Sequence, residues 1–253
     1  MKFIENCRIV DRKWLTKDTY EIVFETKDIA KESYAGQFVE VKLDQCFLRR
    51  PISIGKVSGN NIHLYVKVVG RGTKNLSTIA LGEEINIIGP LGNTFSKPKN
   101  KRIAVVGGGI GIAPLVEYIR NIETDNEIYA FLGYKDELFL TDYFHDVADE
   151  VYVSVENNEN GDARYITELL EKAIDEHIEI DKIVTCGPRG MMKAVMQIAE
   201  KNNIETEASL EERMGCGFGV CVGCSIELRS GEMKKVCVDG PVFDASEVNY
   251  DEW

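Results

Sequence analysis

Four cysteines near the end of the chain have the residue type and the spacing of a metal centre. They follow the pattern Cys216-x4-Cys221-x2-Cys224-x12-Cys237, with three close together and one apart. Thiolates are strong iron ligands, and this spacing is typical of a plant-type [2Fe–2S] cluster. Glycines surround the first three cysteines and permit a tightly folded loop whose backbone N–H groups can turn toward sulfur.

Two other readings of these cysteines stay open. Zinc also accepts four thiolates, although structural zinc sites usually take them from two separate, closely spaced pairs. Here one C-x-x-C overlaps a C-x-x-x-x-C, and Cys237 stands alone. Free or disulfide-bonded thiols are the third reading, and the odd total of seven cysteines argues against a disulfide framework. The spacing favours the iron–sulfur cluster. Cys7 and Cys46 are expected to be buried small apolar residues.

A glycine-rich turn in the middle of the chain has the features of a dinucleotide site. The segment IAVVGGGIGIAPL, residues 103–115, places an apolar run before the glycines and a helical pattern after them. Its register, Gly109-x-Gly111-x-x-Pro114, differs from the usual G-x-G-x-x-G. Glycines let the backbone approach a pyrophosphate, whose charge a helix N-terminus favours. A tight strand–helix turn with no ligand is the alternative.

A second turn is expected to face the same crevice. Cys186-Gly187-Pro188 follows the apolar run Ile183–Thr185. Ligands of open parallel sheets lie beyond the carboxyl ends of the strands, where both turns would stand. On its own, this tripeptide indicates only a strand–helix turn.

A basic pair and two later segments have side chains suited to a flavin. In the run FLRRPISI, residues 47–54, Arg50 can pair with a phosphate and Ser53 can hydrogen-bond a flavin ring. Tyr65-Val66-Lys67 offers an aromatic face, and Gly70-Arg71-Gly72-Thr73 offers an anion-binding turn. From the residues alone, a solvated basic turn is the alternative.

The composition is that of a globular protein with an acidic surface. The 253 residues are 44% hydrophobic and 28% charged, which fits neither disorder nor a fibrous repeat. A net charge of −12 makes nucleic acid an unfavourable partner. The N-terminus lacks the apolar core of a signal peptide, and no run approaches 18 apolar residues. A soluble, cytoplasmic protein without membrane contact is expected.

Three parts are expected along the chain. Residues 1–98 carry short, β-branched and aromatic runs separated by turn residues, which predicts an antiparallel β-barrel. Residues 99–210 alternate strand-like and helical runs, which predicts a parallel sheet covered on both faces. Residues 211–253 are too few to form a hydrophobic core of their own, so a metal centre is expected to stabilise this segment.

The expected elements have approximate bounds. Strands are expected over residues 37–43, 52–57, 61–68 and 84–88 of the barrel, with a helix over 74–79. In the second part, strands are expected over residues 103–106, 127–132, 150–155, 182–185 and 205–209. Helices are expected over residues 112–122, 138–147, 165–177 and 190–201.

Together and in this order, these motifs resemble the ferredoxin-reductase superfamily over essentially the whole chain. Within it, the chain is similar to the family of electron-transfer subunits of class 1B, NAD-dependent dihydroorotate dehydrogenases. The motifs that carry the resemblance are RRPISI, GRGT, GPLGN, GGGIGIAPL, CGP, and EERMGCGFGVC with KVCVDGPVF. It implies an FAD-binding barrel, an NAD-binding α/β domain and a C-terminal [2Fe–2S] segment.

The resemblance also implies which residues bind each group. FAD would be bound by Arg50, Pro51, Ile52, Ser53, Tyr65, Val66, Lys67, Gly72 and Thr73. The cluster would be bound by Cys216, Cys221, Cys224 and Cys237. NAD would lie against Gly109, Gly111, Cys186, Gly187 and Pro188.

A partner and a reaction follow from the same resemblance. The family pairs this subunit with an FMN-containing catalytic subunit, in a heterotetramer with two copies of each. Dihydroorotate is oxidised at the partner's FMN, and electrons pass through the cluster to FAD and on to NAD, in pyrimidine biosynthesis. Hydride transfer needs no general acid or base, so no catalytic side chain is assigned. The three histidines are expected at the surface or in structural roles.

Two other functions stay open. Related chains serve NAD(P)H-dependent ferredoxin, sulfide or sulfite oxidoreductases as flavin and iron–sulfur subunits. A zinc-stabilised redox or binding module without turnover belongs to a different class of protein, and it would be colourless and free of flavin.

Overall fold

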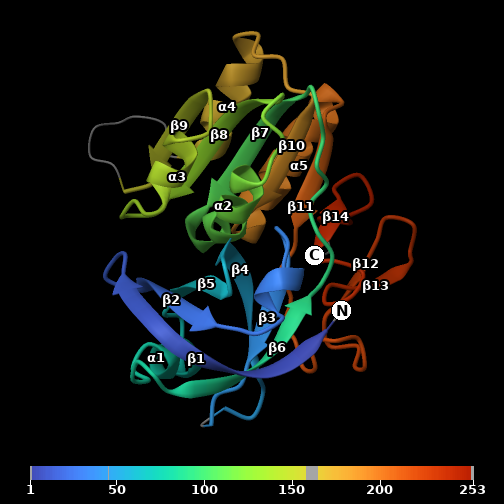
Figure 1. Cartoon of the computed structure of the whole chain (residues 1–253). Coiled ribbons are helices and arrows are strands. Elements are labelled where there is room, and N and C mark those ends of the chain that lie inside the picture. The colour runs from blue at the N-terminus through green and yellow to red at the C-terminus, as the bar shows by residue number, and fades with distance from the viewer. Residues whose placement is uncertain (1, 45, 158–164, 252–253) are drawn as a thin grey trace.

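A β-barrel, a helix-covered sheet and a C-terminal segment follow one another along the chain (Figure 1). The computed structural model describes residues 2–44, 46–157 and 165–251. Among these residues, no helix is long and apolar enough to cross a membrane. The expected fold class is confirmed in all three parts.

The barrel is closed and antiparallel, with strand order β1-β2-β5-β4-β3-β6. Its strands are β1 (Phe3–Trp14), β2 (Thr19–Glu25), β3 (Phe38–Val41), β4 (Arg50–Ser58), β5 (Asn61–Lys67) and β6 (Glu84–Leu91). Side chains alternate along each strand, so Cys7 and Ile9 of β1 point inward while Asn6 and Arg8 are exposed. A short 3₁₀ turn, Ala30–Glu32, lies between β2 and β3.

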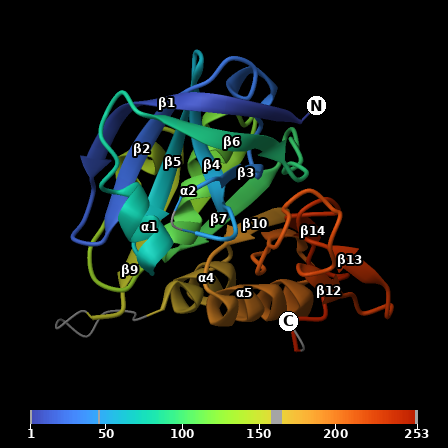
Figure 2. The same cartoon turned by 90° about the horizontal axis from the view of Figure 1, so that it is seen from below.

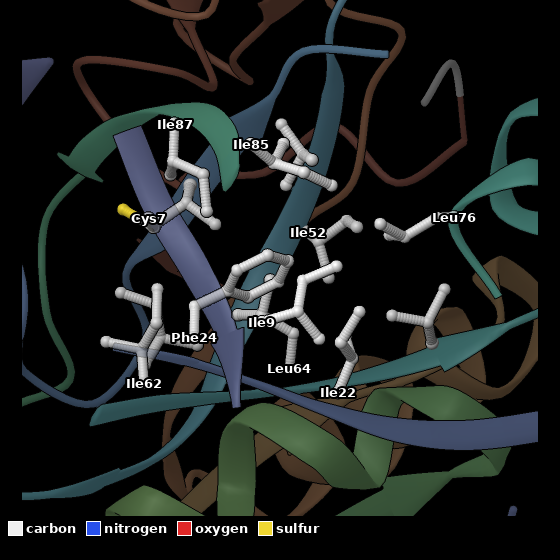
Figure 3. Packing of buried hydrophobic residues seen from close by; sticks show 14 of the residues in the cluster. Cys7, Ile9, Ile22, Phe24, Ile52, Ile62, Leu64, Leu76, Ile85 and Ile87 are labelled. Atoms are coloured by element: carbon white, nitrogen blue, oxygen red, sulfur yellow. The ribbon is translucent and has the colours of Figure 1, made fainter. Parts of the chain in front are cut away.

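Apolar side chains from all six strands fill the barrel (Figure 3). Phe24, Leu64 and Ile87 are completely buried there, and each such side chain contributes about 1.5–3 kcal/mol of hydrophobic stabilisation. Leu76, from helix α1 (Arg71–Leu76), joins the same core. Cys7 is buried within it and Cys46 is half-buried against it, so both are packing residues.

The second part is a six-stranded sheet in the order β14-β11-β10-β7-β8-β9. Its strands are β7 (Arg102–Gly108), β8 (Glu127–Tyr134), β9 (Glu150–Val155), β10 (Lys182–Cys186), β11 (Glu205–Ser209) and β14 (Val242–Asp244). Its helices are α2 (Ile112–Arg120), α3 (Thr141–His145), α4 (Ile166–Asp175) and α5 (Arg189–Asn202). The first five strands are mutually parallel, as the alternating pattern predicts, and β14 is antiparallel.

Helices cover both faces of this sheet. Ile103 and Val105 of β7 share a core with α2 and α3, whereas Ala104 and Val106 share one with α4 and α5. Burial on both faces explains why β7 is a continuous apolar run rather than an alternating one.

The C-terminal segment packs between the barrel and α5 (Figure 2). It contains the hairpin of β12 (Ser225–Glu227) and β13 (Met233–Lys235), then β14, which pairs with β11 at the sheet edge. Asn93 ties the barrel to it, because its side-chain amide donates to Val242 O at 2.7 Å and its Oδ1 accepts from Val242 N at 2.9 Å. The sequence did not predict β14, since three residues carry no periodicity.

Two helix expectations were wrong at their ends. Helix α1 begins at Arg71, three residues before the expected start, because Thr73 Oγ1 accepts hydrogen bonds from the N–H groups of Val69 and Gly70. Helix α3 is confined to Thr141–His145, since Leu140 has a left-handed φ of 64° that no helix can contain. The expected boundaries between the three parts of the chain, at residues 98 and 210, fall in segments that connect strands and stay predictions.

Candidate functional site

The glycine-rich turn and the Cys186-Gly187-Pro188 turn touch each other. They follow β7 and β10, which are adjacent parallel strands at the point where the strand order reverses. A Cβ atom on Gly111 would lie 2.5 Å from Cα of Gly187, so only glycine permits this approach. Open α/β sheets bind ligands at this kind of switch point, and the sequence-predicted residues of both turns meet there.

Backbone is accessible at the first of these turns. Gly109 has φ +51° and no atom stands within 4 Å of where its Cβ would be. The 3₁₀ turn Gly109–Gly111 leads directly into α2, which begins at Ile112. A ligand phosphate can approach the Gly109 backbone, just ahead of the helix, without meeting a side chain at that position. On the second turn, burial raises the pKa of the Cys186 thiol to about 12, so it stays protonated at neutral pH.

Arg50 lies against the turn at the start of α1. A Cβ atom on Gly72 would lie 2.6 Å from Arg50 Nε, so the arginine side chain crosses the glycine directly. Arg50 Nη1 donates to Leu48 O at 2.7 Å, and the Tyr20 hydroxyl donates to Thr73 O at 2.8 Å. The fold therefore brings together a guanidinium and the first turn of α1, which are far apart in the sequence.

The remaining sequence-predicted flavin residues divide between packed side chains and side chains that point away from the barrel core. Ile52 and Val66 point into the barrel core. The Tyr65 ring packs so closely on Gly55, at the face toward α2, that a Cβ there would overlap it. Strand alternation turns Pro51 and Ser53 the other way from Ile52. Contacts of a flavin with Ile52, Tyr65 and Val66 stay predictions, and they would use backbone atoms.

Glu117 joins the barrel to the nucleotide domain, and the sequence did not predict this role. Glu117 of α2 is 6% exposed, and its Oε2 accepts a hydrogen bond of 2.9 Å from Val57 N of β4. Asn121 donates to Oε1 at 2.8 Å. Burial raises the pKa of this carboxyl. No sequence signal distinguishes Glu117 from a surface glutamate, since its partner is a backbone amide 60 residues away.

His63 has a structural role, as expected. Its Nδ1 lies 2.7 Å from Glu21 Oε1 and its Nε2 lies 2.6 Å from Ser58 Oγ, which links three neighbouring strands of the barrel.

Backbone N–H groups of the cysteine loop point toward the Cys216 sulfur. Cys221 N lies 3.4 Å from Cys216 Sγ. Burial opposes ionisation of Cys216, but hydrogen bonds from the backbone of Cys221, Phe218 and Val220 lower its pKa to about 6. Lys235 Nζ donates to Gly219 O at 2.8 Å and ties this loop to β13. A sulfur held by several N–H donors is typical of iron–sulfur loops.

The four cysteines form two pairs. Cys216 contacts Cys221, and Cys237 contacts Cys224 inside the protein, where burial and the Cys224 thiol raise the pKa of Cys237 to about 12. Among the described residues, which include all four, no three Cys, His, Asp or Glu side chains surround one metal position. Tetrahedral zinc needs four thiolates around one point, whereas a two-iron cluster takes two at each iron. The arrangement fits [2Fe–2S] better than zinc.

The fold and these sites define an oxidoreductase of the ferredoxin-reductase type that carries an iron–sulfur segment. Residues 105–197 match the family model of the oxidoreductase NAD-binding domain. Residues 211–249 match that of the iron–sulfur cluster binding domain of dihydroorotate dehydrogenase B. Both matches fall on the sites described above.

Relatives define the family further. The chain is 36% identical over 252 residues to the dihydroorotate dehydrogenase B (NAD(+)) electron transfer subunit of Caldanaerobacter subterraneus subsp. tengcongensis, covering 98% of this chain and 99% of that one. It is 37% identical over 220 residues to the Clostridium perfringens protein of the same name, covering 85% and 87%. This chain belongs to the family of dihydroorotate dehydrogenase B electron transfer subunits, which confirms the resemblance seen in its motifs.

Solved structures agree on the fold. A chain of the NADH-dependent reduced ferredoxin-NADP oxidoreductase superposes with a TM-score of 0.89 at 29% identity, covering 98% of this chain and 91% of that one. A ferredoxin reductase of carbazole 1,9a-dioxygenase superposes with a TM-score of 0.70 at 20% identity, covering 80% and 67%, and shows the fold alone.

Proposed function

We propose that this chain carries electrons from a dihydroorotate-oxidising catalytic subunit through a [2Fe–2S] cluster and FAD to NAD. One contact carries the proposal most directly: Gly217 of the cysteine loop lies against Glu40 of β3, the strand paired with β4, which carries the predicted flavin residues. The cluster loop and the predicted flavin strand are therefore separated by a single strand, as electron transfer between their cofactors requires.

The protein's own residues would bind and orient the cofactors. Bound FAD supplies a group that exchanges hydride with NAD and single electrons with the cluster. Arg50 and the adjoining backbone of Gly72 and Thr73 would hold the FAD pyrophosphate by charge-assisted hydrogen bonds. Pro51 and Ser53, which point away from the barrel core, would face the flavin ring.

The switch point between β7 and β10 would hold NAD. The backbone around Gly109 and Gly111 would receive the pyrophosphate, while Cys186-Gly187-Pro188 would border the nicotinamide. The protonated Cys186 thiol would serve as a contact rather than a nucleophile. Glu117 holds α2 against β4 and so fixes the NAD side of the crevice relative to the barrel.

An exposed apolar surface marks where a partner would dock. It consists of Phe218, Val220, Val222 and Val238, which surround the cysteines and are called the cluster patch here. Val220 and Val222 are 78% and 73% exposed, and apolar side chains gathered around a redox centre are typical of an interaction surface. We assign this patch to an FMN-containing catalytic subunit, in a heterotetramer with two copies of each. Thiolate ligands and NAD suit a cytoplasmic location.

The test begins with anaerobic purification of the chain and analysis of iron, sulfide and flavin. Two irons and one FAD per chain are expected, and a colourless protein with one zinc would overturn the proposal. An FMN-containing catalytic subunit, co-expressed with the chain, should then co-purify and oxidise dihydroorotate with NAD, while the chain alone should oxidise NADH only with artificial acceptors.

A second candidate function rests on the likeness to the NADH-dependent reduced ferredoxin-NADP oxidoreductase. In that case the partner would be a larger iron–sulfur flavoprotein. Ferredoxin reduction by the purified complex, without activity on dihydroorotate, would favour this candidate.

A further inference from the structure

Glu40 is a buried acid that the functions described above leave unexplained. It lies in the middle of β3 and is 1% exposed. Neither carboxyl oxygen has a hydrogen-bond partner among the described residues. Glutamate is almost never fully buried unless it is paired, because desolvating a carboxyl is unfavourable. An apolar side chain would fill this position at lower cost, so packing does not account for the acid.

The carboxyl stands between the flavin-binding strand and the cysteine loop. In the barrel register, Glu40 lies opposite Pro51 of β4 on one side and Ile88 of β6 on the other. From outside the barrel, Gly217 closes over it: a Cβ atom on Gly217 would lie 2.7 Å from Glu40 Cδ. Gly217 has φ +77° and follows Cys216 directly, so the loop bends tightly against this side chain.

The charges around Glu40 have opposite signs on its two sides. Arg49 and Arg50 attract its negative charge, and Arg49 Nη1 also donates to Glu40 O at 3.2 Å. On the loop side, Cys216 repels it. Burial exceeds each of these influences and raises the pKa of the carboxyl to about 7. The side chain is thus held in place by strand pairing and loop closure, with its acid group directed at the cluster ligand region.

We propose that the Glu40 carboxyl, buried where the Cys216 end of the cluster loop closes over β3, keeps the reduction potential of the cluster low. The inference rests on the proposed electron-transfer function. When it is ionised, a carboxylate in a desolvated place disfavours adding an electron nearby, and charge and burial are among the factors that set cluster potentials. A lower cluster potential favours onward transfer of each electron to the flavin.

The test is a redox titration of the anaerobically purified full chain, with the cluster followed by electron paramagnetic resonance and the flavin by absorbance. Glu40→Gln keeps the shape and removes the acid, and is expected to raise the cluster potential with iron and FAD contents unchanged. Glu40→Asp keeps the acid and is expected to stay near the wild-type potential. Glu84→Gln, an exposed acid on β6, is the matched control and should not shift it.

Two results would overturn the role of Glu40. One is an unshifted potential in an iron-loaded and flavin-loaded E40Q chain. The other is a rise in E40D as large as in E40Q, which would show that shape matters and the acid does not. If E40Q binds no iron, E40D decides: the wild-type potential supports the role and a raised potential overturns it. Absence of iron and flavin from the wild-type chain would instead overturn the proposed function itself.

Discussion

Gly111 and Gly187 meet across the switch point of the sheet, where a Cβ atom on Gly111 would lie 2.5 Å from Cα of Gly187. The same Cβ would lie 2.6 Å from the carbonyl carbon of Cys186, so backbone rather than a flexible side chain stands in the way. The turns after β7 and β10 therefore pack backbone against backbone, and a side chain added to Gly111 would displace the second turn.

Gly111→Ala is expected to impair the use of NADH and to leave FAD binding intact. The added methyl group forces the two turns apart, and a displacement of this kind at a nucleotide site costs at least about tenfold in rate. NADH oxidation with ferricyanide, compared with the FAD content of the same sample, measures the effect. Gly190→Ala is the matched control, because a Cβ at that helical position meets nothing within 4 Å. Equal NADH oxidation by G111A and wild type would contradict the assignment of NAD to this crevice.

Arg50→Gln is expected to weaken FAD binding roughly 10- to 100-fold, since hydrogen bonds to charged groups contribute about 1.5–3 kcal/mol. Fluorescence titration of the flavin-free chain with FAD gives the dissociation constants. Arg8→Gln removes an exposed arginine of the same barrel that pairs with Glu25 and should bind FAD as the wild type does. Unchanged FAD affinity in R50Q would show that Arg50 is a solvated basic residue.

Glu117→Gln is expected to change how stability depends on pH. Burial raises the pKa of Glu117 above its ordinary value of 4.5, so the folded chain binds this proton more tightly than the unfolded chain does. Its stabilising contribution is therefore fully present below 4.5 and is lost as pH rises through the raised pKa. The neutral glutamine has no such loss, and the variant should gain stability relative to wild type as pH rises.

Thermal unfolding of both proteins between about pH 5 and about pH 8 measures this difference. Glu123→Gln, an exposed acid just after α2, should follow the wild-type curve. A constant difference between E117Q and wild type across this range would mean that Glu117 does not titrate with unfolding.

The sequence predicted most of the nucleotide domain because its signals are local. β9 and β11 have the expected bounds: β9 is a β-branched and aromatic run, and β11 follows the helix of the last strand–helix pair, where the alternation calls for another strand. The cysteine spacing likewise indicated two-iron chemistry before any geometry was known. The order of the motifs along the chain then indicated the family. Neither the glycine-rich turn nor the Cys186-Gly187-Pro188 turn could have indicated it alone.

What the sequence left out depends on contacts between distant residues. Glu40 and Glu117 look like ordinary polar positions in a strand and a helix, and only the folded chain buries them. The sequence suggested Tyr65 as an aromatic face for the flavin, which stays a prediction, and only the folded chain shows the ring packed on Gly55 at the boundary with α2. Strand β14 forms because Asn93 and β11 offer it hydrogen bonds, a cause that no three-residue pattern can contain.

Val222→Asp is expected to weaken assembly with the catalytic subunit by more than tenfold while leaving the cluster in place. Val222 is 73% exposed between Cys221 and Cys224, so a carboxylate there stays hydrated in the free chain but would be desolvated in a complex. Analytical ultracentrifugation of the co-expressed subunits measures assembly, and iron analysis with NADH–ferricyanide activity shows that the chain itself is intact. Val147→Asp, at an exposed apolar position after α3, is the control and should assemble normally. Full assembly of V222D would move the docking surface away from the cluster patch. If V222D loses its iron, Val220→Asp becomes the deciding variant, since Val220 lies on the other side of Cys221 and is 78% exposed in the same patch.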